Sequence, residues 1–434
     1  MGDLIFAWLD SLDGILWELG VVFIVFFGLY LGVVSRFFQL RKFPQIVSKF
    51  FNCAKSEKSD SRGEHPLKVF FTSIGGAIGI GNVVGVCTAV QIGGPGAIFW
   101  VWVAGFLGML IKYSEVYLGV LYRVNNDEGG YDGGPMYFLQ KAYKTKWIPS
   151  IVCILLCIYG TEIYMFGVMT DSISLNWNLN RFFVMAVLLF LVIYAAQGGI
   201  KRVGNICSAI IPVFVGLFGI MSLWVVLNNL AEIPAMLNVV FTSAFSGHAA
   251  VGGFAGASVM LAMSQGVARG CYSGDIGVGY ASIIHSETRL TDPGAQAGLA
   301  IFGIFLDTFV VCTFSLFLIL VTGVWQESID SSLLVQAALE SFFPHMDLFM
   351  PFFLFLLGYS SMIAFFCVGL KCAKFLSPKK GTRYYYIYAI SALIFFSFFD
   401  KTCALTVMSL SGVLLLFINV VGIFRLRKDI KFND

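Results

Sequence analysis

The chain has 434 residues, of which 58% are hydrophobic and only 12% are charged. A soluble domain has about 25% charged residues, so this composition excludes an ordinary soluble protein and indicates an all-α polytopic membrane protein. The small net charge of +3 gives no indication of nucleic-acid binding, and no nucleic-acid partner is expected.

A transmembrane helix needs about 20 apolar residues, somewhat fewer when flanking side chains reach the interface. On this rule we expect eleven spans, at 19–35, 67–91, 97–123, 148–172, 182–197, 205–227, 252–285, 298–323, 348–375, 386–399 and 404–424. Segments 233–247 and 330–343 are too short or too polar to cross, and we expect both on the outer surface. The basic segment 36–51 fits either an interfacial helix or a solvated linker.

The basic residues indicate the orientation. Of the 28 Lys and Arg residues, 24 fall in alternate loops and tails, while Lys112 and Arg269 lie within spans and only Arg181 and Lys401 fall on the opposite side. Because cytoplasmic loops are rich in Lys and Arg, we expect the N-terminus outside and the C-terminus in the cytosol. The expected location is the plasma (inner) membrane.

Two of the expected spans are interrupted by glycine-rich segments. The first, within 73–95, reads SIGGAIGIGNVVGVCTAVQIGGP, and the second, at 268–280, reads ARGCYSGDIGVGY. A break in a membrane helix is tolerated only where protein, water or a ligand satisfies the freed backbone groups. Freed carbonyls suit a cation and freed amides suit an anionic group, so both breaks are candidate binding sites.

With the first span set aside, ten spans remain as two sets of five, each opening with a broken helix. Sets with an odd number of spans cross the membrane in opposite senses, which is the inverted-repeat arrangement of secondary transporters. We therefore expect an N-terminal helix with a basic linker (1–66), a first repeat (67–228), an outer connecting segment (229–251), a second repeat (252–425) and a cytosolic tail (426–434).

An ordered series of motifs makes this reading specific. The series comprises GIGN at 79–82, GGPGAIFWVWVAGFLGMLIKYSEVYLGVLYR at 93–123, GGPMYFL at 133–139, GGIKRV at 198–203, SAFSGHAAVGGFAGASV at 243–259, GVARG at 266–270, LDTFVVCT at 306–313 and VTGVW at 321–325. It closely resembles the signature of the alanine/glycine:cation symporter family. The resemblance implies a transporter rather than an enzyme: a five-plus-five core after one extra helix, sodium-coupled uptake of a small neutral amino acid, and no cofactor. We expect a monomer.

The resemblance also implies where ions bind. In transporters of this fold, one sodium ion lies between the first broken helix and a hydroxyl pair, here the carbonyls of Gly75 and Ile78 with Ser360 and Ser361. A serine in a membrane helix can instead bond to its own backbone. A second ion site could use the Ala77 carbonyl and the Asn82 amide oxygen.

The substrate pocket is expected around the two breaks. The amides of Gly79 and Gly81 would face the substrate carboxylate. The chain departs from the family at several pocket positions: Ile80 for Thr, Met169 for Gln, Phe365 for Trp, and Gly274 with Asp275 for an Asn–Glu pair. Ile80, Met169 and Phe365 are less polar or differently shaped than the family residues, and they favour a substrate with a small to medium apolar side chain.

Four ionisable residues within spans have open roles. Asp275 either serves the site or caps a helix by pairing with Arg269, and Asp307 is a coupling-ion site, a proton site or a structural partner. Lys112 and Glu115 are expected to form an internal ion pair. A proton-coupled carrier of a different solute and a transporter-like sensor remain alternatives, the sensor being separable only by measured flux.

Overall fold

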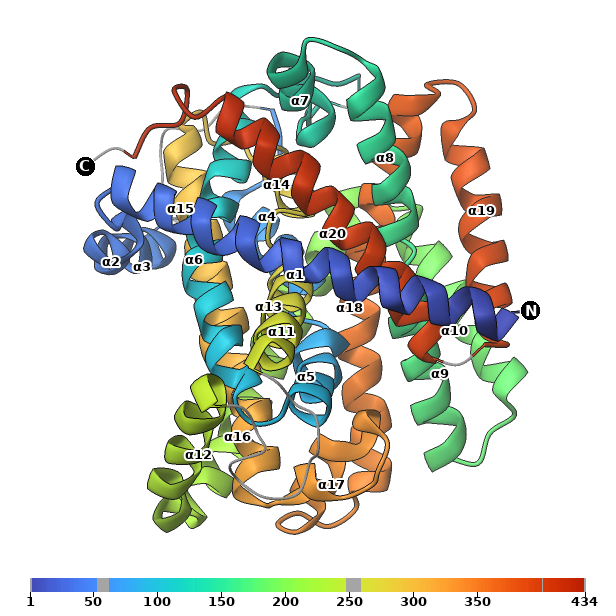
Figure 1. The fold of residues 1–434 in the computed structure, drawn as a ribbon. Helices are drawn as coiled ribbons and strands as arrows, with labels where there is room; N and C mark the ends of the chain where they lie inside the picture. Colours follow the sequence, from blue (N-terminus) through green and yellow to red (C-terminus); the bar gives the residue numbers. More distant parts are fainter. Residues whose placement is uncertain (1, 53–61, 128, 247–258, 400, 433–434) are drawn as a thin grey trace.

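The computed structural model describes residues 2–52, 62–127, 129–246, 259–399 and 401–432, and they are almost entirely helical (Figure 1). The first half contains α1 (Gly2–Val34), α2 (Phe38–Arg41), α3 (Phe43–Asn52), α4 (Pro66–Ala77), η2 (Gly81–Gly85), α5 (Val86–Gly93), α6 (Ala97–Leu121), α7 (Pro135–Tyr143), α8 (Trp147–Tyr159), α9 (Ile163–Asn176), α10 (Arg181–Ala196), α11 (Gly199–Asn228) and η3 (Leu230–Glu232). The second half contains α12 (Ile233–Ser246), α13 (Val259–Gly274), α14 (Tyr280–His285), α15 (Pro293–Ile304), η5 (Phe305–Cys312), α16 (Thr313–Val321), η6 (Val324–Gln326), η7 (Ser331–Leu333), α17 (Leu334–Glu340), α18 (Met346–Leu376), α19 (Gly381–Phe396) and α20 (Lys401–Arg425). Two short strands, β1 (Val124–Asn125) and β2 (Tyr131–Asp132), form an antiparallel hairpin after α6.

The described residues form a multi-pass membrane protein. Seven helical stretches are long and apolar enough to cross a membrane, and the bent pair Pro66–Ala77 and Gly81–Gly93 makes an eighth. The expected spans at 182–197 and 386–399 correspond to α10 and α19, which have 16 residues each. The start of the expected span at 252–285 lies outside the described residues, as does residue 247 of the expected surface segment. The count of eleven spans stays a prediction.

Several helices begin at local sequence signals. Pro66 opens α4, and the preceding His65 accepts the Leu67 N–H through its side chain. Proline suits this position because the first helical N–H has no intrahelical partner. Pro293 opens α15 in the same way after Asp292, whose side chain accepts the N–H of Gly294.

The helices surround a buried centre. Helix α18 packs against α4, α8, α9, α11 and α19, while α6 packs against α13 and α15. The extra N-terminal helix α1 runs beside the C-terminal helix α20 (Figure 1). Trp17 of α1 donates from Nε1 to the Ser409 hydroxyl at 2.8 Å. The two ends of the chain therefore contribute neighbouring helices.

The segments expected on the surface are helical. The basic segment 36–51 contains α2 and α3, and α3 packs against α15. Helices α12 and α17 lie at one end of the molecule, opposite α7 (Figure 1). This arrangement agrees with placing α12 and α17 on one side of the membrane.

One interruption was not predicted. The expected span 148–172 is divided between α8 and α9, and Glu162 at the division has the left-handed φ of 51°. A bulky side chain rarely takes this conformation, which costs of order 1–3 kcal/mol and persists only where the surroundings impose it.

Candidate functional site

The first break lies between α4 and η2, where the helix bends by 45°. In a continuous helix the N–H of Gly79 would bond to the Gly75 carbonyl, but here it donates to Asn82 Oδ1 at 2.9 Å. The Ser361 hydroxyl of α18 donates to the freed Gly75 carbonyl at 3.0 Å and lies 3.5 Å from the Ile78 carbonyl oxygen. A Cβ atom on Gly79 would lie 2.5 Å from Ser361 Oγ, so only glycine permits this approach.

The two expected hydroxyl ligands point to different partners. Ser361 faces the first break, whereas Ser360 donates to the Leu357 carbonyl of its own helix at 2.9 Å. Ala77 is the last residue of α4 and is buried beside these groups. The structure therefore brings Gly75, Ile78 and Ser361 together and turns the Ser360 hydroxyl away from them.

The second break lies between α13 and α14. Asp275, Gly277 and Gly279 all have left-handed φ values, of 52°, 72° and 104°. Lys112 Nζ of α6 donates to the Gly274 carbonyl at 2.7 Å, where α13 ends. A cation at the end of a helix interacts favourably with the exposed carbonyls there.

Glu115 bonds to the helix that follows this break, α14. Its Oε1 accepts the Ser282 N–H of α14 at 3.4 Å. The described ion pairs include none between Lys112 and Glu115, so the expected direct ion pair is not formed, although the two groups still interact electrostatically. Each side chain bonds instead to a different backbone group of the second broken helix. Two charges one turn apart on α6 hold the two ends of the break.

The two breaks meet at Asp307. Asn82 Nδ2 donates to Asp307 Oδ1 at 2.6 Å, and the Thr308 hydroxyl donates to Oδ2 at 3.0 Å. A Cβ atom on Gly274 would lie 3.4 Å from Asp307 Oδ2. Asn82 and Asp307 both lie in π-helical turns, η2 and η5, which pack against each other. Such turns are frequent at functional sites.

Asp275 is completely buried beside this centre. Neither of its carboxylate oxygens has a hydrogen-bond partner within ordinary distance and angle limits among the described residues. The described ion pairs include none between Asp275 and Arg269, so the capping pair considered for them is not formed. The charge of Asp275 interacts instead with Lys112, with the backbone of Ala281 and with Asp307.

The three apolar residues that were expected to line the pocket lie next to the two breaks. Ile80 and Met169 converge on Gly358, where an added Cβ atom would lie 2.7 Å from Ile80 Cδ1 and 2.6 Å from Met169 Sδ. The ring of Phe365 stacks on Tyr280 of α14 with centroids 4.0 Å apart. Gly358 and Phe365 share one face of α18 with Ser361, and all of these residues are buried. None of them is exposed to solvent among the described residues.

Sequence reasoning missed Glu162 and Tyr272. The Tyr272 hydroxyl donates to Glu162 Oε2 at 3.1 Å, and the Tyr272 ring lies 3.1 Å from the position of a Cβ atom on Gly81. The available signal was an acidic residue near the middle of the apolar run 148–172.

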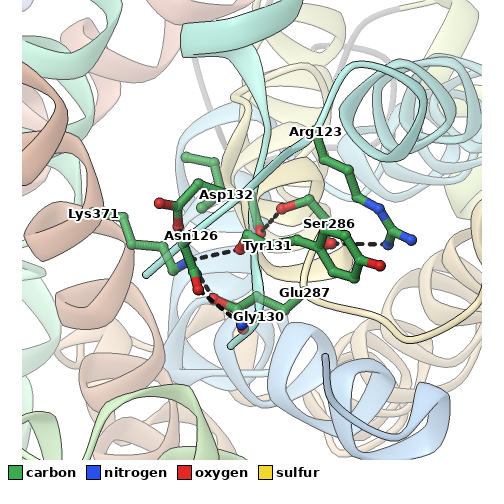
Figure 2. A network of polar contacts seen from close by, with 9 residues as sticks. Arg123, Asn126, Gly130, Tyr131, Asp132, Ser286, Glu287 and Lys371 are labelled. Carbon is green, nitrogen blue, oxygen red and sulfur yellow. Dashed lines mark hydrogen bonds and ion pairs between the residues drawn. The ribbon is translucent and has the colours of Figure 1, made fainter. Parts of the chain in front are cut away.

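A network of polar contacts lies at the end of the molecule that carries the β hairpin. Lys371 of α18 pairs with Asp132 at 2.7 Å and with Glu287, as Figure 2 shows. Arg123 donates to the carbonyls of Ser286 at 3.1 Å, Thr288 at 2.6 Å and Leu290 at 2.9 Å. The network joins the hairpin to the segment after α14.

A cavity of about 460 Å³ adjoins this network and is lined in part by Asp132, Glu287 and Lys371. Burial raises the pKa of the Glu287 carboxyl, and the adjacent Lys371 ammonium opposes that rise. The charged groups at this end therefore hold two distant parts of the chain together beside an open cavity.

Polar breaks in a multi-pass helical fold are typical of membrane transporters, and the family that this chain matches is one of transporters, not of enzymes. The chain belongs to the sodium:alanine symporter family, which it matches over residues 2–432.

Individual relatives agree with this assignment. The chain is 30% identical to the transporter YflA of Bacillus subtilis, with 98% of this chain and 92% of the relative covered. It is 31% identical to the sodium/alanine symporter AgcS of Methanococcus maripaludis, with 87% and 84% covered. The fold is similar to that of MhsT solved with L-phenylalanine, with a TM-score of 0.60, 13% identity, and 85% of this chain and 89% of that chain covered.

Proposed function

We propose that the protein is a sodium-coupled symporter that imports a small neutral amino acid with a small to medium apolar side chain. It works by alternating access as a monomer in the plasma membrane, with the N-terminus outside and the C-terminus in the cytosol. Its core consists of two inverted repeats, at 67–228 and 252–425.

The observation that carries the proposal is the meeting of Ser361 with the carbonyl oxygens of Gly75 and Ile78, at 3.0 and 3.5 Å. Sodium is a hard cation that prefers oxygen ligands, and unwound helix carbonyls supply them in transporters. When the ion binds, the Ser361 hydroxyl turns its proton away and presents a lone pair. The Ser360 hydroxyl, which bonds within its own helix, is assigned no ligand role.

Asn82 connects the second ion site to the site of the substrate carboxylate. In this structure Asn82 Oδ1 accepts the Gly79 N–H. A substrate carboxylate that accepts the amides of Gly79 and Gly81 would release Asn82 Oδ1, which could then bind an ion together with the Ala77 carbonyl. Substrate and ion would thus favour each other's binding, as symport requires.

The remaining residues set the rest of the pocket. The buried carboxylate of Asp275, next to Gly274, makes no hydrogen bond of ordinary geometry among the described residues and can receive the substrate ammonium group. Ile80, Met169 and Phe365 provide the apolar wall.

The test is uptake by the purified protein in liposomes, driven by an inward sodium gradient and screened over the twenty amino acids and their D-forms. The proposal expects accumulation that collapses when sodium is equal on both sides. Binding without sodium-driven flux would assign the protein to the sensors instead.

A further inference from the structure

Glu162 is a buried acidic residue that the proposed sodium and substrate sites do not use. It lies at the N-cap of α9 with 1% of its surface exposed and a left-handed φ of 51°. Short polar side chains at this position often accept an N–H of the first helical turn, but the Glu162 side chain makes no such bond. The side chain is directed to Tyr272 of α13 instead.

The carboxyl group of Glu162 is only half satisfied. Oε2 accepts the Tyr272 hydroxyl at 3.1 Å, while Oε1 is buried without a partner among the described residues. None of the described ion pairs involves Glu162. An ionised carboxylate in such a place costs several kcal/mol unless a positive charge joins it.

The groups around Glu162 do not supply that charge. The titratable groups that interact with it electrostatically are Tyr159 of α8, Tyr272 of α13, Asp275 of the second break and Tyr280 of α14. Helices α10, α18, α19 and α20 also pack against α9, and their described residues add no charged group to this set. Arg269 interacts with Tyr272 but forms no ion pair with Glu162 within the described chain.

Tyr272 connects this carboxyl group to the first broken helix. Its ring edge would lie 3.1 and 3.2 Å from a Cβ atom on Gly81, so the ring rests directly on that glycine. Gly81 belongs to the segment whose amides are proposed to hold the substrate. A change in how firmly Glu162 holds the Tyr272 hydroxyl therefore acts directly on the backbone of the binding site.

We propose that Glu162 is a proton-binding site of this carrier, and that Tyr272 conveys its protonation state to Gly81. A hydronium ion transfers its proton to Oε1: one O–H bond of the donor breaks, an O–H bond forms at Oε1, water is left behind, and the carboxylate loses its negative charge. The bond from Tyr272 to the ionised carboxylate is charge-assisted and about twice as strong as a bond to a neutral carboxyl. Protonation thus loosens the hold of Glu162 on Tyr272, and deprotonation restores it. The inference rests on the proposed carrier function.

The transport experiment compares sodium-driven uptake in liposomes across a range of pH for wild type and Glu162→Gln. Glutamine keeps the volume and an acceptor for Tyr272 but cannot titrate. In wild type, the substrate concentration for half-maximal uptake is expected to change by up to about tenfold per pH unit on one side of the pKa of Glu162. Glu162→Gln should change less than twofold over the same range.

Two further variants separate titration from packing. Glu232→Gln, at an exposed acid of η3, should keep the wild-type profile. Tyr272→Phe retains the ring on Gly81 and loses only the hydroxyl that bonds to Glu162. The substrate half-saturation of this variant should therefore lose most of its pH dependence, although the Glu162 carboxyl still titrates. A purely structural role for Glu162 would lower the rate of the glutamine variant and leave its pH profile unchanged, which would overturn the inference.

A spectroscopic measurement keeps the test independent of transport. Infrared difference spectra between high and low pH, recorded on the protein in lipid, should contain a carboxylic-acid C=O band that Glu162→Gln lacks and Glu232→Gln retains. Identical bands in wild type and Glu162→Gln would overturn the proton site even if uptake itself fails. Failure of sodium-driven uptake in wild type, with the Glu162 band present, would overturn the proposed symport alone.

Discussion

Lys112 Nζ lies 2.7 Å from the carbonyl oxygen of Gly274, where α13 ends. The Lys112 ammonium also interacts with the buried carboxylates of Asp275 and Asp307. One side chain of α6 therefore both caps the second broken helix and supplies positive charge to the centre where the two breaks meet.

Replacing this lysine should destabilise the protein strongly. Lys112→Met leaves buried carboxylates without their cation, a change that typically costs about 3–5 kcal/mol. We expect a clear fall in the thermal unfolding midpoint in detergent. Lys112→Met combined with Asp275→Asn should recover part of the loss, because one uncompensated charge is removed as well.

The matched control is Lys141→Met, at an exposed lysine of α7, for which we expect a change within about 0.5 kcal/mol. Equal midpoints for Lys112→Met and Lys141→Met would show that the buried lysine is not required for the fold.

The adjacent serines provide a matched pair for sodium. Ser361→Ala removes the hydroxyl that faces the Gly75 and Ile78 carbonyls. Losing one neutral oxygen ligand costs about 1–2 kcal/mol, so the sodium concentration for half-maximal uptake should rise roughly tenfold. Substrate affinity at saturating sodium should change less.

Ser360→Ala is the control, since this hydroxyl bonds to the Leu357 carbonyl of its own helix. We expect its sodium dependence to stay near that of wild type. If Ser360→Ala weakened sodium dependence more than Ser361→Ala, the assignment of ligands would be reversed.

The sequence predicted the helical membrane class, both glycine-rich breaks and the family, because composition and local motifs report these features. It did not predict the break at Glu162, since the surrounding run 148–172 carries no glycine cluster and resembles one continuous helix. The sequence also could not show whether a buried charged side chain pairs with its neighbour on the same helix or with a distant part of the chain. Lys112 and Glu115 lie one turn apart, yet each bonds to backbone that the fold brings in from more than 150 positions away.

Cysteine labelling can test the orientation. The uneven distribution of Lys and Arg predicts that the 62–66 region is cytosolic and that Glu327 is outside. Gly63 itself is unsuitable for a tag, because its φ is 84° and a Cβ atom would lie 2.6 Å from the Glu287 carbonyl oxygen. A membrane-impermeant thiol reagent added to cells should label Glu327→Cys and leave Arg62→Cys unlabelled until the membrane is opened. Labelling of both residues from the same side would contradict the proposed topology.

Stability should depend on pH through His65 at the start of α4. Burial lowers the pKa of His65 below its ordinary value of 6.5, and the charge of Arg289 lowers it further. The pKa of His65 is therefore lower in the folded protein than in the unfolded chain, so neutral His65 stabilises the fold. This contribution to stability is complete above about pH 6.5 and is lost as the pH falls through the folded pKa. Protonation also removes the lone pair of Nδ1 that accepts the Leu67 N–H.

The measurement is the thermal unfolding midpoint between about pH 7.5 and pH 5.5, in wild type and His65→Asn. Asparagine caps helices without titrating, so the variant should lose part of the wild-type decrease at low pH, an effect of up to about 1 kcal/mol. The same decrease in both proteins would place the responsible group elsewhere.

The substrate range should follow from the apolar wall. Ile80, Met169 and Phe365 are buried and offer no hydrogen-bonding side-chain group to a substrate. Leaving a polar substrate side chain unpaired there costs about 1–3 kcal/mol, so amino acids such as Ser and Gln should compete poorly. A competition series against the best substrate measures this preference, and equal competition by polar and apolar amino acids would remove these three residues from the pocket.

Phe365→Trp should narrow the range toward glycine and alanine. The Phe365 ring already stacks on Tyr280 at 4.0 Å, so a larger ring must extend into the space left for the substrate side chain. Phe366→Trp is the matched control, because the neighbouring ring packs against Tyr385 at 5.0 Å on another face of α18. Both variants carry the cost of overpacking, but only Phe365→Trp should change the ratio of uptake between alanine and larger apolar amino acids. A similar change of that ratio in both variants would show that the narrowing comes from general distortion of α18.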